Sequence, residues 1–295
     1  MVFGPMNARP ACPLCAGRRT RPRFRRGEYT IFACRACGGG FAWPRLGPAG
    51  LGGVYDDAYA ETYVSGVMHG ADFAERRFAQ LEKSLLRHAP ALLSRPGARM
   101  LDIGCASGGL MAESRRRGWR PEGVEYSEAL AAQARSSGLD VHGGDFLGLH
   151  LEAGSYDLIT MFHVVEHFDD PTAAVAKCHA LLCEGGVLVM ETPNWRGIGA
   201  LVRRSRWSHI TPPEHINYFG PAALRRLTRR GGFTTTRAVT ITPQVIEAVA
   251  AWPRLGVAVA RTAYRLAALL GLGTTLQVFA SKGDPFRAGR REWLP

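Results

Sequence analysis

From residue 99 onward, short apolar runs alternate with amphipathic segments. The pattern predicts strands at 99–103, 121–125, 141–143, 156–162, 187–191, 233–242 and 275–281, with helices at 71–88, 108–117, 128–136, 172–182 and 222–230. Strands and helices that alternate at this spacing form a parallel sheet with helices on both faces. We therefore predict an α/β fold with a doubly wound, mostly parallel sheet, whose ligands bind beyond the carboxyl ends of the strands.

Residues 163–167 read HVVEH, which matches the H-x-x-E-H pattern of some zinc peptidases. That chemistry needs His163 and His167 on one face of a helix. The preceding residues 156–162 instead predict a buried strand, and Asp170-Pro171 begins a new helix. The match is therefore interpreted as accidental, and the segment is placed at the end of the fourth strand.

Two C-x2-C pairs lie near the N-terminus, separated by 18 residues: Cys12 and Cys15, then Cys34 and Cys37. Four thiolates in two close pairs can surround one tetrahedral Zn2+, and Tyr29–Phe32 supplies a strand between the two turns. Such a site has no open coordination position. The spacing predicts a small zinc ribbon over residues 1–45 with a structural metal.

The net charge is +12, and residues 1–45 carry nine arginines and one acid. These arginines could contact phosphates of a nucleic acid or of a nucleotide-linked small molecule, or could be a solvated surface. The sequence leaves these readings open, with nucleic acid the less favoured partner. No signal peptide or membrane-spanning apolar run is evident, which favours a cytoplasmic protein with reduced cysteines.

The remaining chain divides by composition. Residues 46–69 are expected to be a linker, 70–283 the main domain and 284–295 a tail. A helical insertion is expected at about 243–272. Its apolar stripe favours core packing or a homodimer contact, with peripheral membrane binding beside a lipid-linked acceptor as the alternative.

The sequence LDIGCASGG at 101–109 follows the first strand and opens the first helix. A glycine-rich turn there lets a ligand approach the backbone, and Glu125 can accept hydrogen bonds from ribose hydroxyls. Both NAD and S-adenosylmethionine suit that geometry. Ala106 would obstruct a pyrophosphate, and Asp102 would repel phosphates but attract the ammonium or sulfonium of a methyl donor. The cofactor is therefore predicted to be S-adenosylmethionine.

On these motifs the chain resembles the class I S-adenosylmethionine-dependent methyltransferases, which have a Rossmann-like fold, over roughly residues 70–282. The resemblance includes the 144–146 segment GDF, whose acid binds adenine in the family, and LLCEGGVL at 181–188. It implies a cofactor site formed by Asp102, Gly104, Cys105, Ala106, Gly108, Glu125, Tyr126, Asp145, Phe146 and His163.

Methyl transfer to oxygen or carbon also needs a base, and histidine is suited to that role. The candidates are His167 and His215. Residues 212–219, PPEHINYF, resemble sugar C-methyltransferases, in which the histidine is the base. HVVEH resembles ubiquinone-pathway O-methyltransferases that can hold a divalent ion, although His163 replaces their first acid, so divalent-ion use stays open.

The sequence thus predicts a small-molecule methyltransferase with a structural Zn2+. The acceptor would be a sugar, a glycolipid, a quinone-like compound or a secondary metabolite, methylated on oxygen or carbon. The alternative is a zinc-ribbon RNA methyltransferase, and a third reading is a non-catalytic protein that binds the cofactor. The acceptor, the methylated atom and the oligomeric state are not determined by the sequence.

Overall fold

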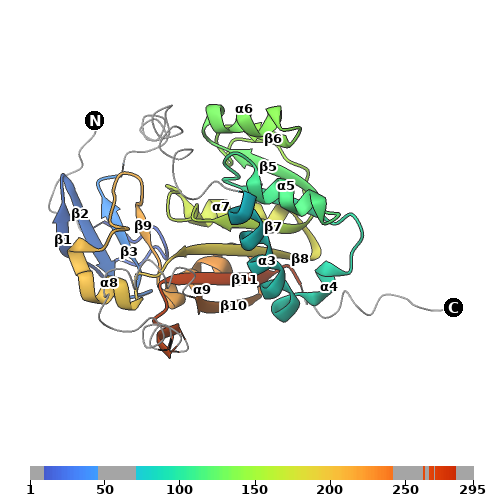
Figure 1. Cartoon of the computed structure of the whole chain (residues 1–295). Helices are drawn as coiled ribbons and strands as arrows, with labels where there is room; N and C mark the ends of the chain where they lie inside the picture. Colours follow the sequence, from blue (N-terminus) through green and yellow to red (C-terminus); the bar gives the residue numbers. More distant parts are fainter. Residues whose placement is uncertain (1–9, 46–70, 242–261, 263–265, 269, 284–295) are drawn as a thin grey trace.

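The computed structural model describes residues 10–45, 71–241, 262, 266–268 and 270–283. Two sheets organise this part of the chain (Figure 1). The predicted linker at 46–69, most of the insertion at 243–272 and the tail at 284–295 lie outside the described residues.

The larger sheet has seven strands in the order β10-β11-β8-β7-β4-β5-β6. Its strands are β4 (Arg99–Ile103), β5 (Arg120–Glu125), β6 (Asp140–Gly143), β7 (Tyr156–Phe162), β8 (Leu182–Pro193), β10 (Thr235–Ile241) and β11 (Thr275–Ser281). The pairs from β6 across to β8 are parallel, whereas β11 runs antiparallel to both β8 and β10. The predicted fold class, a mostly parallel α/β sheet, is confirmed.

Helices cover both faces of this sheet. They are α3 (Ala71–His88), α4 (Pro90–Leu93), α5 (Gly109–Arg116), α6 (Glu128–Ser136), α7 (Pro171–Leu181) and α9 (Pro221–Arg230). On one face, apolar residues of α7 and α9 pack with Leu101, Ile159 and Leu188. On the other, Phe78 and Leu85 of α3 pack with alternate strand residues. Successive side chains of each buried strand point to opposite faces of the sheet, so the same strands contribute to both hydrophobic cores.

The smaller sheet has the order β1-β2-β3-β9 and is antiparallel throughout. The N-terminal segment contributes β1 (Thr20–Arg26), β2 (Tyr29–Cys34) and β3 (Gly40–Trp43), whereas β9 (Asn217–Tyr218) comes from the segment that follows β8. Between β8 and β9 lie α8 (Ile198–Arg203) and a 3-10 turn at Arg204–Arg206. The ribbon therefore lies against the carboxyl end of the main sheet (Figure 1).

Residues 163–167 form a turn after β7 and contain no helix. The prediction that HVVEH is not a peptidase helix is confirmed. Among the described residues, no helix combines the length and apolar character needed to cross a membrane.

Candidate functional site

The turn between β4 and α5 has three residues in the left-handed region. Gly104 has φ +73°, Ala106 φ 50° and Gly108 φ +82°. A Cβ on Gly108 would lie 2.2 Å from Leu139 Cδ1, so a larger residue would have to displace the Leu139 side chain as well as adopt a strained conformation. The turn brings backbone to the carboxyl ends of β4 and β5, where the sequence places the cofactor.

Asp102 lies in β4 and is only 4% exposed. The Thr160 hydroxyl donates to its Oδ1 at 2.7 Å. Burial raises the pKa of Asp102 to about 7, and the hydrogen bond from Thr160 offsets part of that effect. A buried carboxyl of this kind is stabilised in its charged form by a cation that binds beside it.

Glu125 ends β5 and is likewise buried. Its two oxygens accept from the backbone N–H groups of Ala106, at 2.8 Å, and Ser127, at 2.9 Å. Burial raises the pKa of Glu125, although both contacts act in the opposite direction. A carboxylate oxygen can accept more than one hydrogen bond, so Glu125 keeps acceptor capacity for ribose hydroxyls. Tyr126, beside it, is 37% exposed.

The 145–149 loop follows β6 at the same edge. Asp145 is exposed, and its carboxylate accepts from Leu147 N–H at 3.1 Å. The Phe146 side chain is buried in the core, so it does not line an open surface. The Lys177 ammonium lies 4.8 Å from the Phe146 ring and donates to the backbone carbonyls of Phe146 and Leu149, which fixes the loop.

Most of the predicted cofactor residues therefore meet at one edge of the sheet. Asp102, Gly104, Ala106, Gly108 and Glu125 share the turns after β4 and β5, and the Asp145 loop follows β6. Cys105 is buried, and burial raises its pKa, which suits packing rather than reactivity. Carboxylates beside the glycine turn fit a cationic adenosyl cofactor and disfavour a dinucleotide. The residues present thus fit S-adenosylmethionine.

The turn after β7 carries a second group of titratable residues. Glu166 is 1% exposed, and neither carboxylate oxygen has a hydrogen-bond partner among the described residues. His163 Nδ1 lies 3.5 Å from Glu166 Oε1. Burial acts to raise the pKa of Glu166, but contact with His163 and the charges of His163, His167 and His215 in their protonated forms outweigh it and lower the pKa to about 2. The site therefore contains a buried anion.

Both ring nitrogens of His167 contact backbone carbonyls, Nδ1 with Glu214 at 2.9 Å and Nε2 with His163 at 3.0 Å. A carbonyl oxygen only accepts, so both contacts are satisfied only by a doubly protonated ring. Burial lowers the pKa of His167, whereas the Glu166 carboxylate opposes that shift. When both contacts are made, His167 has no lone pair with which to accept a proton.

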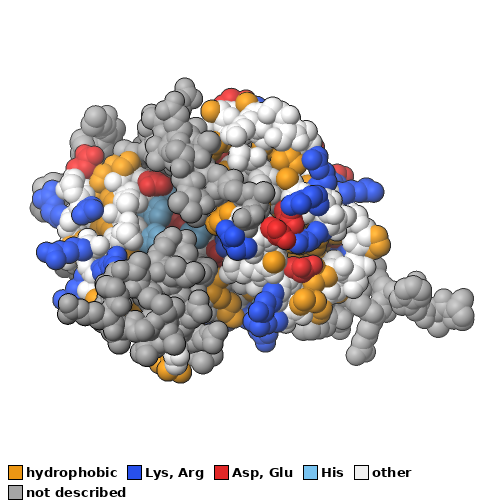
Figure 2. Space-filling view, viewed as in Figure 1, with side chains coloured by type: hydrophobic (Ala, Val, Ile, Leu, Met, Phe, Trp, Pro, Cys, Tyr) orange, Lys and Arg blue, Asp and Glu red, His pale blue; other side chains and the backbone are white. Residues whose placement is uncertain are grey.

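His215 differs in this respect. Its Nδ1 contacts the His209 carbonyl at 3.1 Å, which makes Nδ1 the donor and leaves Nε2 as the acceptor of the neutral ring. Burial lowers the pKa of His215. The His215 ring lies 4.8 Å from the His167 ring and is stacked with His209 at 5.8 Å. In Figure 2, histidine side chains are visible at the molecular surface between the ribbon and the main sheet.

Glu166, His167 and His215 each offer one atom that could bind a metal ion, and these three atoms lie within 4.8 Å of one another. This spacing would allow a metal ion, but the donor set holds a single carboxylate, whereas Mg2+ prefers oxygen ligands. The two carbonyl contacts of His167 would also have to break. The geometry supports proton transfer better than Mg2+ binding.

The four predicted zinc ligands Cys12, Cys15, Cys34 and Cys37 are all buried and unbridged. Cys12 Sγ lies 3.8 Å from Cys37 Sγ, and Cys15 Sγ lies 3.6 Å from Cys34 Sγ. Tetrahedral Zn2+ with bonds of about 2.3 Å requires sulfur separations of about 3.8 Å, so the cluster fits zinc.

Several residues that contact this site were not predicted from sequence. His209 supplies the carbonyl that orients His215, and Arg45, Asp169 and Asn217 hold the turn after β7. No motif marked His209, which lies outside the PPEHINYF segment. Asn217 lies within that segment, but its contact with Phe168 joins two segments that are far apart in the chain. Arg45 ends the segment FAWPR at 41–45, which was linked to the ribbon without any contact being predicted for Arg45.

Comparisons with known proteins identify the family and the fold of the chain. A family profile described as "Methyltransferase domain" matches residues 73–238, more than half of the chain. A ubiquinone biosynthesis O-methyltransferase of Xanthomonas axonopodis pv. citri is 35% identical over 135 residues, which are 42% of this chain and 55% of the relative. An uncharacterized 37.1 kDa protein in transposon TN4556 of Streptomyces fradiae is 33% identical over 179 residues, 56% of this chain and 52% of that protein.

The chain thus spans about half the length of the curated relatives it matches. Among solved structures, the PH0226 protein of Pyrococcus horikoshii matches with a TM-score of 0.53 at 16% identity, over 75% of this chain and 98% of that chain. An S-adenosylmethionine-dependent methyltransferase of Archaeoglobus fulgidus matches with a TM-score of 0.52 at 17% identity, over 76% and 100%. The chain belongs to the methyltransferase-domain family and has the fold of S-adenosylmethionine-dependent methyltransferases.

Proposed function

We propose that this protein transfers the methyl group of S-adenosylmethionine to an oxygen or carbon atom of a small molecule. Asp102, Glu125 and the glycine turn would bind the cofactor, and His215 would be the base. The observation that carries the proposal is the contact of His215 Nδ1 with the His209 carbonyl, which leaves Nε2 able to accept a proton beside a buried anion. Residues 1–45 would hold a structural Zn2+.

When bound, S-adenosylmethionine supplies a methyl group on a positively charged sulfur, which leaves as a neutral thioether. His215 Nε2 would take a proton from the acceptor as the oxygen or carbon atom of the acceptor attacks that methyl group. The His215 imidazolium formed in this step lies close to the Glu166 carboxylate, which stabilises its charge. His167 would hold the turn through its two carbonyl contacts.

The ubiquinone biosynthesis O-methyltransferases among the relatives support a small-molecule acceptor methylated on oxygen. The test is methyl transfer from labelled S-adenosylmethionine to fractionated small-molecule extracts, with bulk RNA as a parallel fraction. Labelling of a small-molecule fraction that is lost in His215→Gln, but not in the exposed control His150→Ala, supports the proposal. No labelling of any small-molecule fraction contradicts it.

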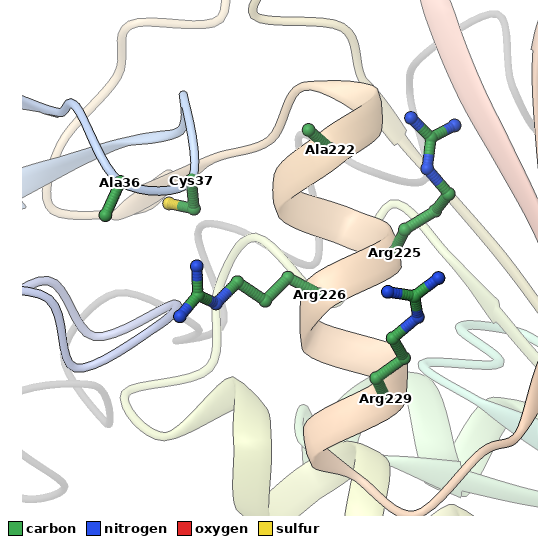
Figure 3. A pocket seen from close by; sticks show the side chains of 6 residues that line it. All are labelled: Ala36, Cys37, Ala222, Arg225, Arg226 and Arg229. Carbon is green, nitrogen blue, oxygen red and sulfur yellow. The ribbon is translucent and has the colours of Figure 1, made fainter.

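A second candidate function, methylation of RNA, is favoured by one feature. A hollow of about 450 Å3 is lined by Ala36 and Cys37 of the ribbon and by Ala222, Arg225, Arg226 and Arg229 of α9. Figure 3 shows Arg226 reaching from α9 toward the ribbon, with Arg225 and Arg229 on the other side of the helix. No acidic side chain forms an ion pair with these arginines in the part of the chain that the structure describes.

Such a cluster can bind phosphate groups. RNA binding that weakens steeply with salt, and is reduced in Arg225→Gln/Arg226→Gln/Arg229→Gln, would favour this second function. A matched triple change of the ribbon arginines Arg21, Arg23 and Arg25 to Gln distinguishes the hollow from general positive charge.

A further inference from the structure

Arg45, the last described residue of the N-terminal segment, makes four hydrogen bonds to residues far along the chain. Nε donates to Asp169 Oδ1 at 2.7 Å, and Nη2 donates to the backbone carbonyls of Asp169, at 2.7 Å, and Phe168, at 3.1 Å. Nη1 donates to Asn217 Oδ1 at 3.2 Å. The Arg45 side chain is 11% exposed, whereas that of Asp169 is 40% exposed, so the guanidinium is largely shielded from water and the Asp169 carboxylate is not.

Asn217 continues the connection from β9. Its side-chain amide donates to the carbonyls of Phe168, at 2.7 Å, and Glu166, at 3.3 Å. The backbone N–H groups of Ile216 and Asn217 also donate to the Glu166 carbonyl, at 3.2 and 3.0 Å. The turn that carries Glu166 and the strand that follows His215 are therefore bonded to each other directly.

The ribbon strand β3 completes the arrangement. Phe41 pairs with Asn217 and Gly40 with Tyr218, and the Ala42 N–H donates to the Ile216 carbonyl at 2.9 Å. The segment from 211 to 218 is thus held between the ribbon on one side and the turn after β7 on the other. The hydrogen bonds of Arg45 go to Phe168, Asp169 and Asn217, and none of them reaches β4 or β5.

We propose that Arg45 is a positioning residue through which the ribbon fixes Glu166, His167 and His215, where the proposed function places the methyl acceptor. Arg45 does not set the affinity for the cofactor. Its guanidinium joins the turn after β7, β9 and the ribbon at one point. A lysine cannot reproduce this, because an ammonium lacks the planar fork that reaches Asp169 and Asn217 together. The expected loss of catalytic rate rests on the proposed function. The expected loosening of residues 163–169 does not.

The experiment compares wild type, Arg45→Met, Arg45→Lys and the exposed ribbon control Arg26→Met. Hydrogen exchange measured by mass spectrometry should rise by about tenfold or more in peptides covering 163–169 and 211–218 of Arg45→Met, less in Arg45→Lys, and not in Arg26→Met. Calorimetry should give S-adenosylmethionine affinities within about twofold of wild type in all four proteins. Turnover should fall on the order of 10- to 100-fold in Arg45→Met, because misplacing a reacting group costs that much.

Asp169→Asn breaks the ion pair by removing the charge of Asp169 instead of that of Arg45, and it leaves the ribbon sequence intact. It should reproduce the rise in exchange at 163–169 with unchanged zinc content. Unchanged hydrogen exchange in both Arg45→Met and Asp169→Asn overturns the inference. A loss of cofactor affinity in Arg45→Met as large as its loss of turnover also overturns it. The exchange result is independent of methyl transfer, so it decides the role of Arg45 even where His215→Gln shows the proposed base to be wrong.

Discussion

Val164 packs against the cofactor turn so closely that a Cβ on Gly104 would lie 2.4 Å from Val164 Cγ2. The turn after β7, which carries Glu166 and His167, therefore packs directly against the start of the glycine turn after β4. Because Gly104 also has φ +73°, both space and conformation require glycine there.

Gly104→Ala should weaken S-adenosylmethionine binding by about tenfold or more, since the new methyl group must displace Val164 or the turn. Gly118→Ala is the matched control: its φ is +84°, but nothing lies within 4 Å of the added Cβ. It should share the cost in thermal stability without the loss of cofactor affinity, both measured by calorimetry. Equal affinities in the two variants would show that the contact with Val164 is irrelevant to the cofactor.

Cofactor affinity should depend on pH through Asp102. Burial raises the pKa of this carboxyl to about 7 in the free protein, and a bound cation favours the charged form, so binding releases a proton below that pH. Affinity should then rise by about tenfold from pH 6 to pH 8. Titration calorimetry in two buffers of different ionisation enthalpy measures the released proton. Asp102→Asn should bind weakly and with no such dependence.

His215→Gln should lower turnover by a factor on the order of 100 to 10,000 while cofactor affinity stays unchanged. Burial lowers the pKa of His215 below its ordinary value of 6.5, so the wild-type rate should be flat above that pH and fall only under more acidic conditions, as Nε2 becomes protonated. The measurement is kcat/KM for the methyl acceptor against pH at saturating S-adenosylmethionine, which removes the pH dependence of cofactor binding. A rate that is unchanged in His215→Gln would exclude His215 as the base.

Cys12→Ser should remove the metal and destabilise the ribbon. A tetrathiolate zinc site supplies several kcal/mol of folding free energy in a module with little core of its own. Metal content by mass spectrometry should fall from about one zinc per chain toward zero, and the melting temperature should fall with it. Cys183→Ser, outside the cluster, controls for loss of a thiol. A full zinc content in Cys12→Ser would refute the four-cysteine site.

Local sequence determined the main sheet and its glycine turn. Hydrophobic period sets strands and helices, so the predicted helix 128–136 and the strands 99–103, 156–162 and 275–281 have the same bounds in the structure. The antiparallel placement of β11 between β8 and β10 was not evident, because strand direction depends on a long connection. The cysteine spacing likewise indicated the ribbon, since ligand spacing is itself a local property.

What the sequence determined by itself is the chemistry available at each strand end: carboxylates near the ends of β4 and β5, a glycine turn between them, and two cysteine pairs. Only the tertiary structure decided which histidine keeps a free lone pair. Both ring nitrogens of His167 meet carbonyls, those of Glu214 and His163, whereas His215 contacts the carbonyl of His209 through Nδ1. Tertiary structure also joined the ribbon to the turn after β7 and to β9, through β3 with β9 and Arg45 with Asp169. Hydrogen bonds between segments more than 100 residues apart leave no periodic signal in a chain, so folding alone reveals them.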